Sequence, residues 1–150
     1  MNKDSAISIL KANGAVIGKN NDIETPIVFH NCTNFSNLVI GDNCHIGKNC
    51  FFDLRGKVII KNNVVISMQT TFITHQDISR SDLNTVFPAS YKDILIHDNC
   101  YIGADVTILK GVTINESAVI GAKSLVTKDV MKNTINFGVP AKKIKDIIKA

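Results

Sequence analysis

His75 is the residue of this sequence best suited to proton transfer. It lies in the segment FITHQD, where a regular repeat of the chain stops. Because imidazole titrates near neutrality, such a histidine suits the removal of a proton from a substrate. A histidine base needs a partner that fixes its tautomer, and Asp53 and Asp77 are the candidate carboxylates. The alternative interpretation is that all three are polar residues of corners and turns.

The remaining potential metal ligands show no spacing typical of a metal site. No two cysteines are separated by two residues, so we predict that no metal is bound. Cys32 and Cys50 are 18 positions apart and are expected to stack in successive coils of a repeat. The four cysteines are predicted to be small core residues: Cys32, Cys44, Cys50 and Cys100. The other histidines are predicted to be solvated: His30, His45 and His97.

The element that must position His75 is a repeat of six residues. Neither an α-helix nor an ordinary strand has a period of six. A triangular coil with one inward aliphatic side chain per face has a period of six, and hexapeptide repeats are typical of β-helical solenoids. We therefore predict parallel β-helix coils over 16–75 and 95–135. In the clearest stretch a branched aliphatic returns at every sixth position: Ile96, Ile102, Ile108, Ile114, Ile120 and Val126.

The repeat is irregular in the first half of the chain. It begins loosely near Ile17 and passes through a weak position at Asn34. The interval from Phe52 to Ile60 is eight residues, which predicts a bulged corner beginning at Asp53. Residues 76–94 have no period, and an insertion of this length in a compact solenoid predicts a protruding loop.

The two ends of the chain depart from the coil. Residues 1–13 are compatible with a short helix capped by Asp4, or with a strand. Near the other end, Gly138 and Pro140 mark a break. Residues 140–149 place isoleucines at helical spacing, so we predict a short amphipathic helix that caps the open end of the solenoid.

Length and charge limit the function classes. The chain has 150 residues, which fits one domain over 1–150, and 45% of them are hydrophobic. The net charge of +4 is mild, with lysines near the C-terminus, and favours a local anionic partner over nucleic acid. No apolar run could span a membrane. The opening residues lack a secretory leader, so a cytoplasmic location is expected.

Three segments carry a family resemblance: IGADVTILKGVTI, AVIGAKSLVTKDV and GVPAKKIK. They resemble the hexapeptide-repeat acyltransferases, and in particular the sugar O-acetyltransferases that act on galactosides, maltose or surface polysaccharides. The resemblance covers residues 28–148. It implies a left-handed parallel β-helix, a homotrimer with active sites between subunits, acetyl-CoA as the donor and a saccharide as the acceptor.

The same resemblance assigns roles to individual residues. It places the catalytic base at His75, and an acceptor contact in the bulge region that contains Asp53. Relatives often have arginine at the positions of Lys142 and Lys145, so the charge is kept here but the bidentate fork is lost. The residues that match the coenzyme groove of the relatives are Ala104, Ala122, Thr127, Lys128, Lys142 and Lys145.

Three other functions remain open at this point. The runner-up is N-acetylation of an amino sugar with the same base and donor. A zinc-dependent carbonic anhydrase of the γ type shares the coil architecture, but its pattern needs two histidines about five residues apart, which this chain lacks. A non-enzymatic solenoid would not need a histidine before a long loop.

Overall fold

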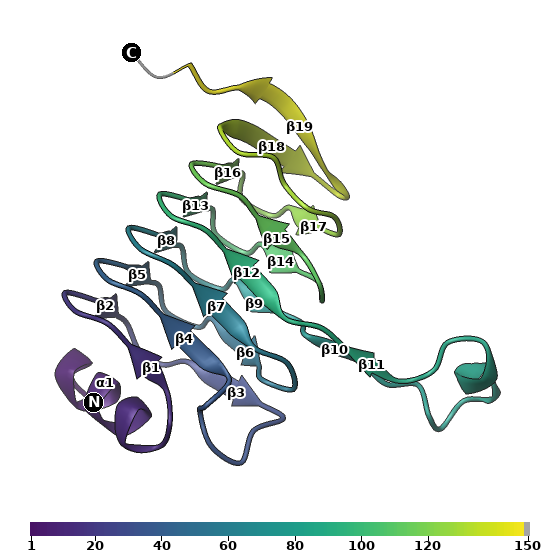
Figure 1. The fold of residues 1–150 in the computed structure, drawn as a ribbon, viewed down its shortest axis with the longest axis horizontal. Helices are drawn as coiled ribbons and strands as arrows, with labels where there is room; N and C mark the ends of the chain where they lie inside the picture. Colours follow the sequence, from purple (N-terminus) through teal and green to yellow (C-terminus); the bar gives the residue numbers. More distant parts are fainter. Residues whose placement is uncertain (149–150) are drawn as a thin grey trace.

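The computed structural model describes residues 1–148 and shows a parallel β-helix of about six turns. Three sheets form its faces, and the coils stack along one axis (Figure 1). Sheet 1 contains β1 (Val16–Ile17), β4 (Leu38–Ile40), β7 (Val58–Ile60), β12 (Ile94–Ile96) and β15 (Thr113–Ile114). Sheet 2 contains β2 (Asp22–Ile23), β5 (His45–Ile46), β8 (Val65–Ile66), β13 (Tyr101–Ile102), β16 (Val119–Ile120), β18 (Thr134–Gly138) and β19 (Ala141–Asp146). Sheet 3 contains β3 (Val28–His30), β6 (Phe51–Asp53), β9 (Thr71–Phe72), β14 (Thr107–Ile108) and β17 (Leu125–Val126).

The core consists of aliphatic and aromatic side chains stacked in register from coil to coil. On sheet 1, Ile60 pairs with Ile40 below and Ile96 above, and all three are buried. On sheet 3, the rings of Phe52 and Phe72 stack with centroids 4.6 Å apart. Each fully buried aliphatic side chain contributes about 1.5–3 kcal/mol of hydrophobic stabilisation. The six-residue period therefore records one inward side chain per face, as predicted.

Asparagines close the tight corners between sheet 1 and sheet 2. Asn20, Asn43 and Asn63 all have positive φ, which asparagine tolerates better than most residues. Their side chains form a ladder, because the Nδ2 of Asn20 donates to Oδ1 of Asn43 at 2.9 Å and Asn43 donates likewise to Asn63 at 2.9 Å. The polar residues between the aliphatic positions thus link successive coils.

All the extra residues of the irregular coils lie at one corner, between sheet 3 and sheet 1. Sheet pairing relates Leu95 to Thr113, an interval of 18 residues and the regular coil length. Earlier intervals on the same sheet are 23 (Val16 to Val39), 20 (Leu38 to Val58) and 36 (Val58 to Ile94). The insertions are residues 31–37, 54–57 and 73–93, which follow β3, β6 and β9. We call this edge the insertion corner.

The first insertion overturns two expectations. Asn34 is exposed and lies within residues 31–37, so it is not a position of the repeat. Cys32 lies in the same insertion and does not stack on Cys50, because Val28 pairs with Phe51 and the interval there is 23 residues rather than 18. Cys44, Cys50 and Cys100 are buried in the core as predicted, whereas Cys32 is half-buried.

The third insertion is the protruding arm. Its base is a two-stranded antiparallel ribbon of β10 (His75–Gln76) and β11 (Ser90–Tyr91), and its tip contains the 3₁₀ helix η1 (Asp82–Thr85). Figure 1 shows the arm extending away from the coils. The predicted loop therefore has secondary structure of its own, and it begins at His75 itself.

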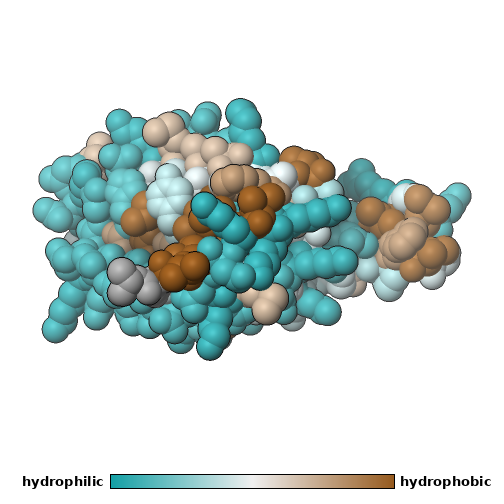
Figure 2. Space-filling model, turned by 90° about the horizontal axis from the view of Figure 1, so that it is seen from above, coloured by the Kyte–Doolittle hydropathy of each residue, from teal (hydrophilic) through white to brown (hydrophobic). Residues whose placement is uncertain are grey.

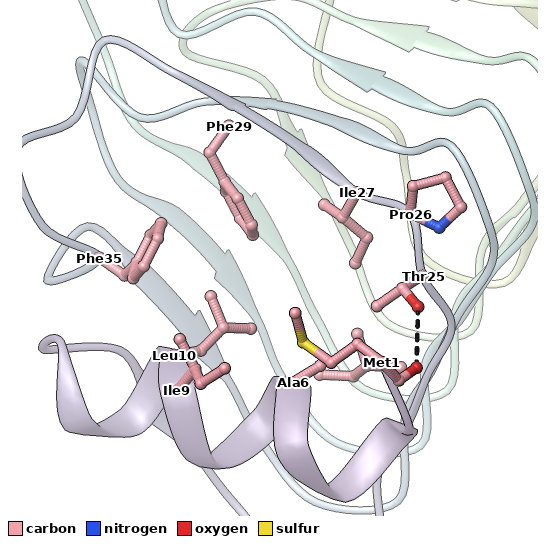
Figure 3. A pocket seen from close by; sticks show the side chains of 10 residues that line it. Met1, Ala6, Ile9, Leu10, Thr25, Pro26, Ile27, Phe29 and Phe35 are labelled. Atoms are coloured by element: carbon pink, nitrogen blue, oxygen red, sulfur yellow. Dashed lines mark hydrogen bonds between the residues drawn. The ribbon is translucent and has the colours of Figure 1, made fainter.

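The N-terminal residues form the helix α1 (Lys3–Ala12), which covers the first coil with Ala6 and Leu10. Its N-cap is Asn2, whose side chain accepts a hydrogen bond from the N–H of Ser5 at 2.8 Å, so the predicted cap at Asp4 is wrong. Figure 3 shows the apolar cavity of about 470 Å³ that remains between α1 and the first coil. Within residues 1–148 no helix has the length and apolar character needed to cross a membrane.

The predicted C-terminal helix over 140–149 is wrong. Residues 141–146 form β19, which pairs antiparallel with β18 at the open edge of sheet 2 (Figure 1). The reversal uses Gly138, whose φ of +108° lies in the left-handed region. An unpaired edge strand offers a row of hydrogen-bonding groups that a hairpin satisfies and a packed helix would not. Ile144 is exposed, so no helical apolar face is buried there, and residue 149 lies outside the described part.

Candidate active site

Three successive insertions bring together side chains that are far apart in the chain. Asn31 follows β3, Asp53 ends β6, and His75 follows β9, so each comes from the insertion corner of a different coil. The pairing of β3 with β6 sets His30 opposite Asp53. The coil stack therefore places an amide, a carboxylate and an imidazole next to one another.

The carboxylate of Asp53 is the centre of this cluster. Its Oδ2 atom lies 2.5 Å from Nδ1 of His75 and accepts hydrogen bonds from the backbone N–H groups of Thr74 at 2.8 Å and His75 at 3.1 Å. Its Oδ1 atom accepts from Nδ2 of Asn31 at 2.9 Å and from the backbone N–H of Arg55 at 3.2 Å. Asp53 is 1% exposed, so these contacts hold it in one orientation.

These contacts keep Asp53 ionised. Burial alone would raise the pKa of this carboxyl, but the hydrogen bonds from His75, from Asn31 and from the backbone of Thr74 and Arg55 together outweigh burial. The pKa of Asp53 is lowered from 3.8 to about 2. An ionised carboxylate accepts a hydrogen bond and donates none, so the proton of the neutral imidazole lies on Nδ1. Nε2 is then the ring nitrogen that carries the lone pair, and Nδ2 of Asn31 lies 3.4 Å from it.

Asn31 is a member of the site that sequence reasoning missed. Its Nδ2 atom lies 3.3 Å from Nδ1 and 3.4 Å from Nε2 of His75, and its φ of 56° is left-handed. The signal that could have revealed it is the 23-residue interval between β1 and β4, which places an insertion directly after His30. His30 is exposed as predicted, but it lies beside the site, with its ring centroid 6.4 Å from that of His75.

His75 borders a cavity of about 220 Å³ between the insertion corner and the arm. Asn31 and Arg55 line one side, and Ser90 and Tyr91 of the arm line the other. Asp77 also borders this cavity, but its Oδ1 atom accepts a hydrogen bond from the backbone N–H of Ser79 at 2.8 Å. Asp77 is therefore a turn residue, and Asp53 is the carboxylate that contacts His75.

Ala104 and Ala122 lie at another edge of the solenoid, the corner between sheet 2 and sheet 3. Among residues 1–148, no hydrogen-bond acceptor is found for the backbone N–H of either alanine. By contrast, side chains cap the equivalent N–H groups between sheet 1 and sheet 2, as where Asp42 accepts from Lys19 at 2.7 Å. Gly103 keeps this corner tight, because a Cβ there would lie 2.6 Å from the nitrogen of Ala122. We call this edge the alanine corner.

The remaining predicted coenzyme residues are spread over two further places. Thr127 and Lys128 follow β17 at the sheet 3 to sheet 1 edge, two coils beyond His75. Lys142 and Lys145 lie on β19 and are exposed. Neither forms an ion pair within the described residues, whereas Lys143 is paired with Asp146 at 2.7 Å. One chain alone therefore does not gather His75 and the predicted coenzyme residues into a single pocket.

The described residues give little support to a metal site or to a cysteine nucleophile. No cluster of three or more histidine, cysteine, aspartate or glutamate side chains is placed to hold a metal ion among residues 1–148. Burial raises the pKa of the Cys50 thiol to about 11 and also raises the pKa values of Cys44 and Cys100. These three thiols are core residues and not nucleophiles.

Two family models match the sequence. The model described as bacterial transferase hexapeptide (six repeats) matches residues 93–128, and the model described as hexapeptide repeat of succinyl-transferase matches residues 37–68. Between them they cover parts of the coils on both sides of the arm.

Two proteins with similar sequences are acetyltransferases. The chain is 32% identical to a galactoside O-acetyltransferase of Escherichia coli (strain K12), over 93% of this chain and 68% of that protein. It is also 32% identical to a galactoside O-acetyltransferase of Lactococcus lactis subsp. lactis (strain IL1403), over 95% of this chain and 70% of that protein. The chain thus spans about two thirds of the length of these relatives.

Solved structures agree with the sequence matches. A maltose O-acetyltransferase from Clostridium difficile 630 superposes with a TM-score of 0.84 at 30% identity, over 97% of this chain and 76% of that one. A galactoside acetyltransferase in complex with coenzyme A superposes with a TM-score of 0.82 at 30% identity, over 95% of this chain and 70% of that one.

Proposed function

Because the chain belongs to the hexapeptide-repeat acetyltransferases, within their sugar O-acetyltransferase branch, we propose that it transfers the acetyl group of acetyl-CoA to a hydroxyl group of a saccharide. The observation that carries this proposal is the contact of 2.5 Å between Nδ1 of His75 and the buried carboxylate of Asp53. That contact leaves Nε2 of the same ring available as a general base beside a cavity.

The proposed reaction is direct transfer within a ternary complex. Nε2 of His75 removes the proton of the acceptor hydroxyl as its oxygen attacks the thioester carbonyl. A carbon–oxygen bond forms, and the carbon–sulfur bond breaks when the tetrahedral intermediate collapses. The imidazolium then returns its proton to the departing thiolate, which leaves as coenzyme A. Asp53 stabilises the imidazolium through its charge and its hydrogen bond, as a carboxylate does in other histidine-based acyl transfers.

The alanine corner supplies features suited to the donor. Backbone N–H groups without an internal acceptor can bind the amide carbonyls of the pantetheine arm, or an oxyanion that develops during transfer. The small side chains of Ala104 and Ala122 allow a ligand to approach these groups closely. Lys48 and Met68 lie at the same corner in earlier coils and carry long exposed side chains. We therefore assign the donor to the coils of the two alanines, with Lys142 and Lys145 near its phosphates.

The separation of the two corners favours a trimer. His75 lies at the insertion corner, whereas the alanines lie at the other edge of sheet 3. A second chain packed side by side would place its alanine corner against the His75 cavity. The arm tip carries Leu83, Val86 and Phe87, which are exposed in one chain, and Figure 2 shows hydrophobic atoms gathered on the arm. Because three-fold closure buries such heterologous contacts without forming an open filament, we propose a homotrimer with a site at each interface.

An acceptor screen with mass detection tests this function. The chain is incubated with acetyl-CoA and mono- or oligosaccharides, and both coenzyme A and the acetylated product are quantified. An ester product, labile to mild base, supports O-acetylation. A stable amide formed only on amino sugars would replace the proposal with N-acetylation. Absence of product with every saccharide, while thioester hydrolysis stays at the uncatalysed rate, would contradict it.

A further inference from the structure

A second cavity adjoins the one that contains His75. It has a volume of about 630 Å³, within the range of small-molecule sites, and its floor is the first insertion, residues 31–37. Asn31, Arg55 and Tyr91 line both cavities. Arg55 therefore borders the space next to His75 as well as the larger cavity.

The charge that lines the larger cavity is positive only. Among the described residues that line it, Arg55 is the one that carries a charge, and the others are mainly amides and hydroxyls. Within residues 1–148 no carboxylate lies within 4.0 Å of the Arg55 guanidinium, so Arg55 forms no ion pair, although its charge attracts the Asp77 carboxylate over a longer distance. A positive group among neutral hydrogen-bonding partners is suited to an anionic, hydroxyl-rich ligand.

Arg55 is also held in place. Its backbone N–H donates to Oδ1 of Asp53 at 3.2 Å, which ties its main chain to the carboxylate that contacts His75. Its Cζ atom lies 5.9 Å from the ring centroid of Tyr91, on the arm, which is within the range of a cation–π contact. Such stacking leaves the edge of the guanidinium, with its N–H donors, open to a planar or tetrahedral oxyanion.

We propose that the acceptor is an acidic saccharide and that Arg55 binds its oxyanion, a carboxylate or a phosphate group close to the hydroxyl that faces His75. The inference rests on the proposed function and deepens it by assigning the class of acceptor. In this arrangement the hydroxyl-bearing ring occupies the cavity beside Nε2 of His75. Arg55 then fixes its orientation from the junction with the larger cavity.

The test compares acceptors that differ in one charged group. Galactose, galacturonate and galactose 1-phosphate are each offered to the full chain with saturating acetyl-CoA, and kcat/KM is measured. The kcat/KM of at least one of the two acids is expected to exceed that of galactose by about 10- to 100-fold, which is the effect of a hydrogen bond to a charged group. A gain confined to galacturonate assigns a carboxylate, and a gain confined to galactose 1-phosphate assigns a phosphate.

Variants at Arg55 and at a matched lysine identify the group responsible. Arg55→Gln should reduce the ratio of acid to galactose to about one, and Arg55→Lys should keep part of it, because the charge remains but the fork is lost. Lys57→Gln removes the same charge two residues away, outside the lining of both cavities, and should leave the ratio unchanged. An equal kcat/KM for all three sugars, or a preference that survives Arg55→Gln, overturns the inference but not the acetyltransferase function.

A binding measurement separates the inference from the reaction. Ligand-observed NMR of the same three sugars, with coenzyme A present, reports affinity even if none of them is acetylated. Tighter binding of an acid that is lost in Arg55→Gln supports the inference independently of turnover. Equal binding of the acids and galactose overturns it.

Discussion

Nδ1 of His75 lies 2.5 Å from Oδ2 of Asp53, although 22 residues separate them in the chain. The contact exists because a coil lengthened by two residues returns the chain so that the end of β6 lies beneath the start of the arm. Asp53 is buried and satisfied on both oxygens, whereas the imidazole reaches a cavity. This asymmetry agrees with the roles that we propose for them, with Asp53 as the orienting group and His75 as the reacting group.

Replacement of His75 by alanine should abolish most turnover. Loss of a general base costs about 10²- to 10⁴-fold in rate, so kcat should fall by that factor while the KM for acetyl-CoA changes little. Steady-state kinetics with the best acceptor of the screen measure both. His97→Ala, in a coil without an insertion, is the control. A His75→Ala enzyme that keeps more than about a third of the wild-type kcat would remove His75 from the mechanism.

Asp53→Asn should also lower kcat, by about 10²- to 10⁴-fold, because an amide cannot both accept from Nδ1 and balance the imidazolium charge. The KM for acetyl-CoA should stay nearly constant, since Asp53 lies away from the alanine corner. Circular dichroism confirms that the variant is folded under assay conditions. Near-normal kcat in a folded variant would mean that Asp53 is structural only.

Asp53 should also make folding sensitive to acid. Its pKa is about 2 in the folded chain against 3.8 as its ordinary value, so the unfolded chain takes up the proton first as the pH falls. The stabilisation is therefore present above about pH 4 and is lost towards pH 2, with a size of about 2 kcal/mol. Urea unfolding of wild type and Asp53→Asn at a series of pH values measures this difference. If wild type and Asp53→Asn differ in free energy of unfolding by the same amount at pH 5 and pH 2.5, Asp53 is not the source of the acid sensitivity.

The lysines of β19 should affect the binding of acetyl-CoA more than the rate of acetyl transfer. Lys142→Ala combined with Lys145→Ala should raise the KM for acetyl-CoA more than it lowers kcat, because phosphate contacts stabilise ground and transition states alike. The effect should weaken at high salt and with a donor that lacks the 3′-phosphate. Lys143→Ala, which removes a lysine paired with Asp146, is the control. An unchanged KM in the double variant would leave the β19 lysines as solvated surface residues.

Mixed trimers should show that two chains build each site. His75→Ala disables the insertion corner, and Ala122→Trp obstructs the alanine corner, so each homotrimer should be inactive. Mixed assemblies should recover part of the activity, because some interfaces then pair an intact insertion corner with an intact alanine corner. Light scattering at the assay concentration establishes the assembly state. A fully active monomer, or no recovery on mixing, would exclude a shared site.

The fold was predictable wherever the six-residue period is strict. Ile96 to Val126 follow it without interruption, and each of these side chains is buried where the repeat places it. The structure of the C-terminal segment was not predictable in this way. Isoleucines at helical spacing in a short segment cannot reveal that the edge of β18 needs a hydrogen-bond partner. Pairing across a sheet edge depends on distant residues and leaves no local period.

The site was predictable only in part, for the same reason. His75 and the bulge at Asp53 stand out because a clear period stops or lengthens there. Asn31 lies where the early repeat is already loose, so its insertion was hidden by the apparent position at Asn34. Arg55 and Tyr91 come from two different insertions, and only the stacked coils bring them together.

The confinement of every insertion to one corner has a consequence for how this enzyme could change its acceptor. Each coil rests only on the coils next to it, and a loop that leaves at a corner does not disturb the inward ladder. Residues 32–37 could therefore be shortened, lengthened or exchanged for those of a relative while Asn31, the buried ladder and the contact of His75 with Asp53 stay in place. Substrate range and folding would then vary independently, which makes this loop the natural position for transplanting specificity between relatives.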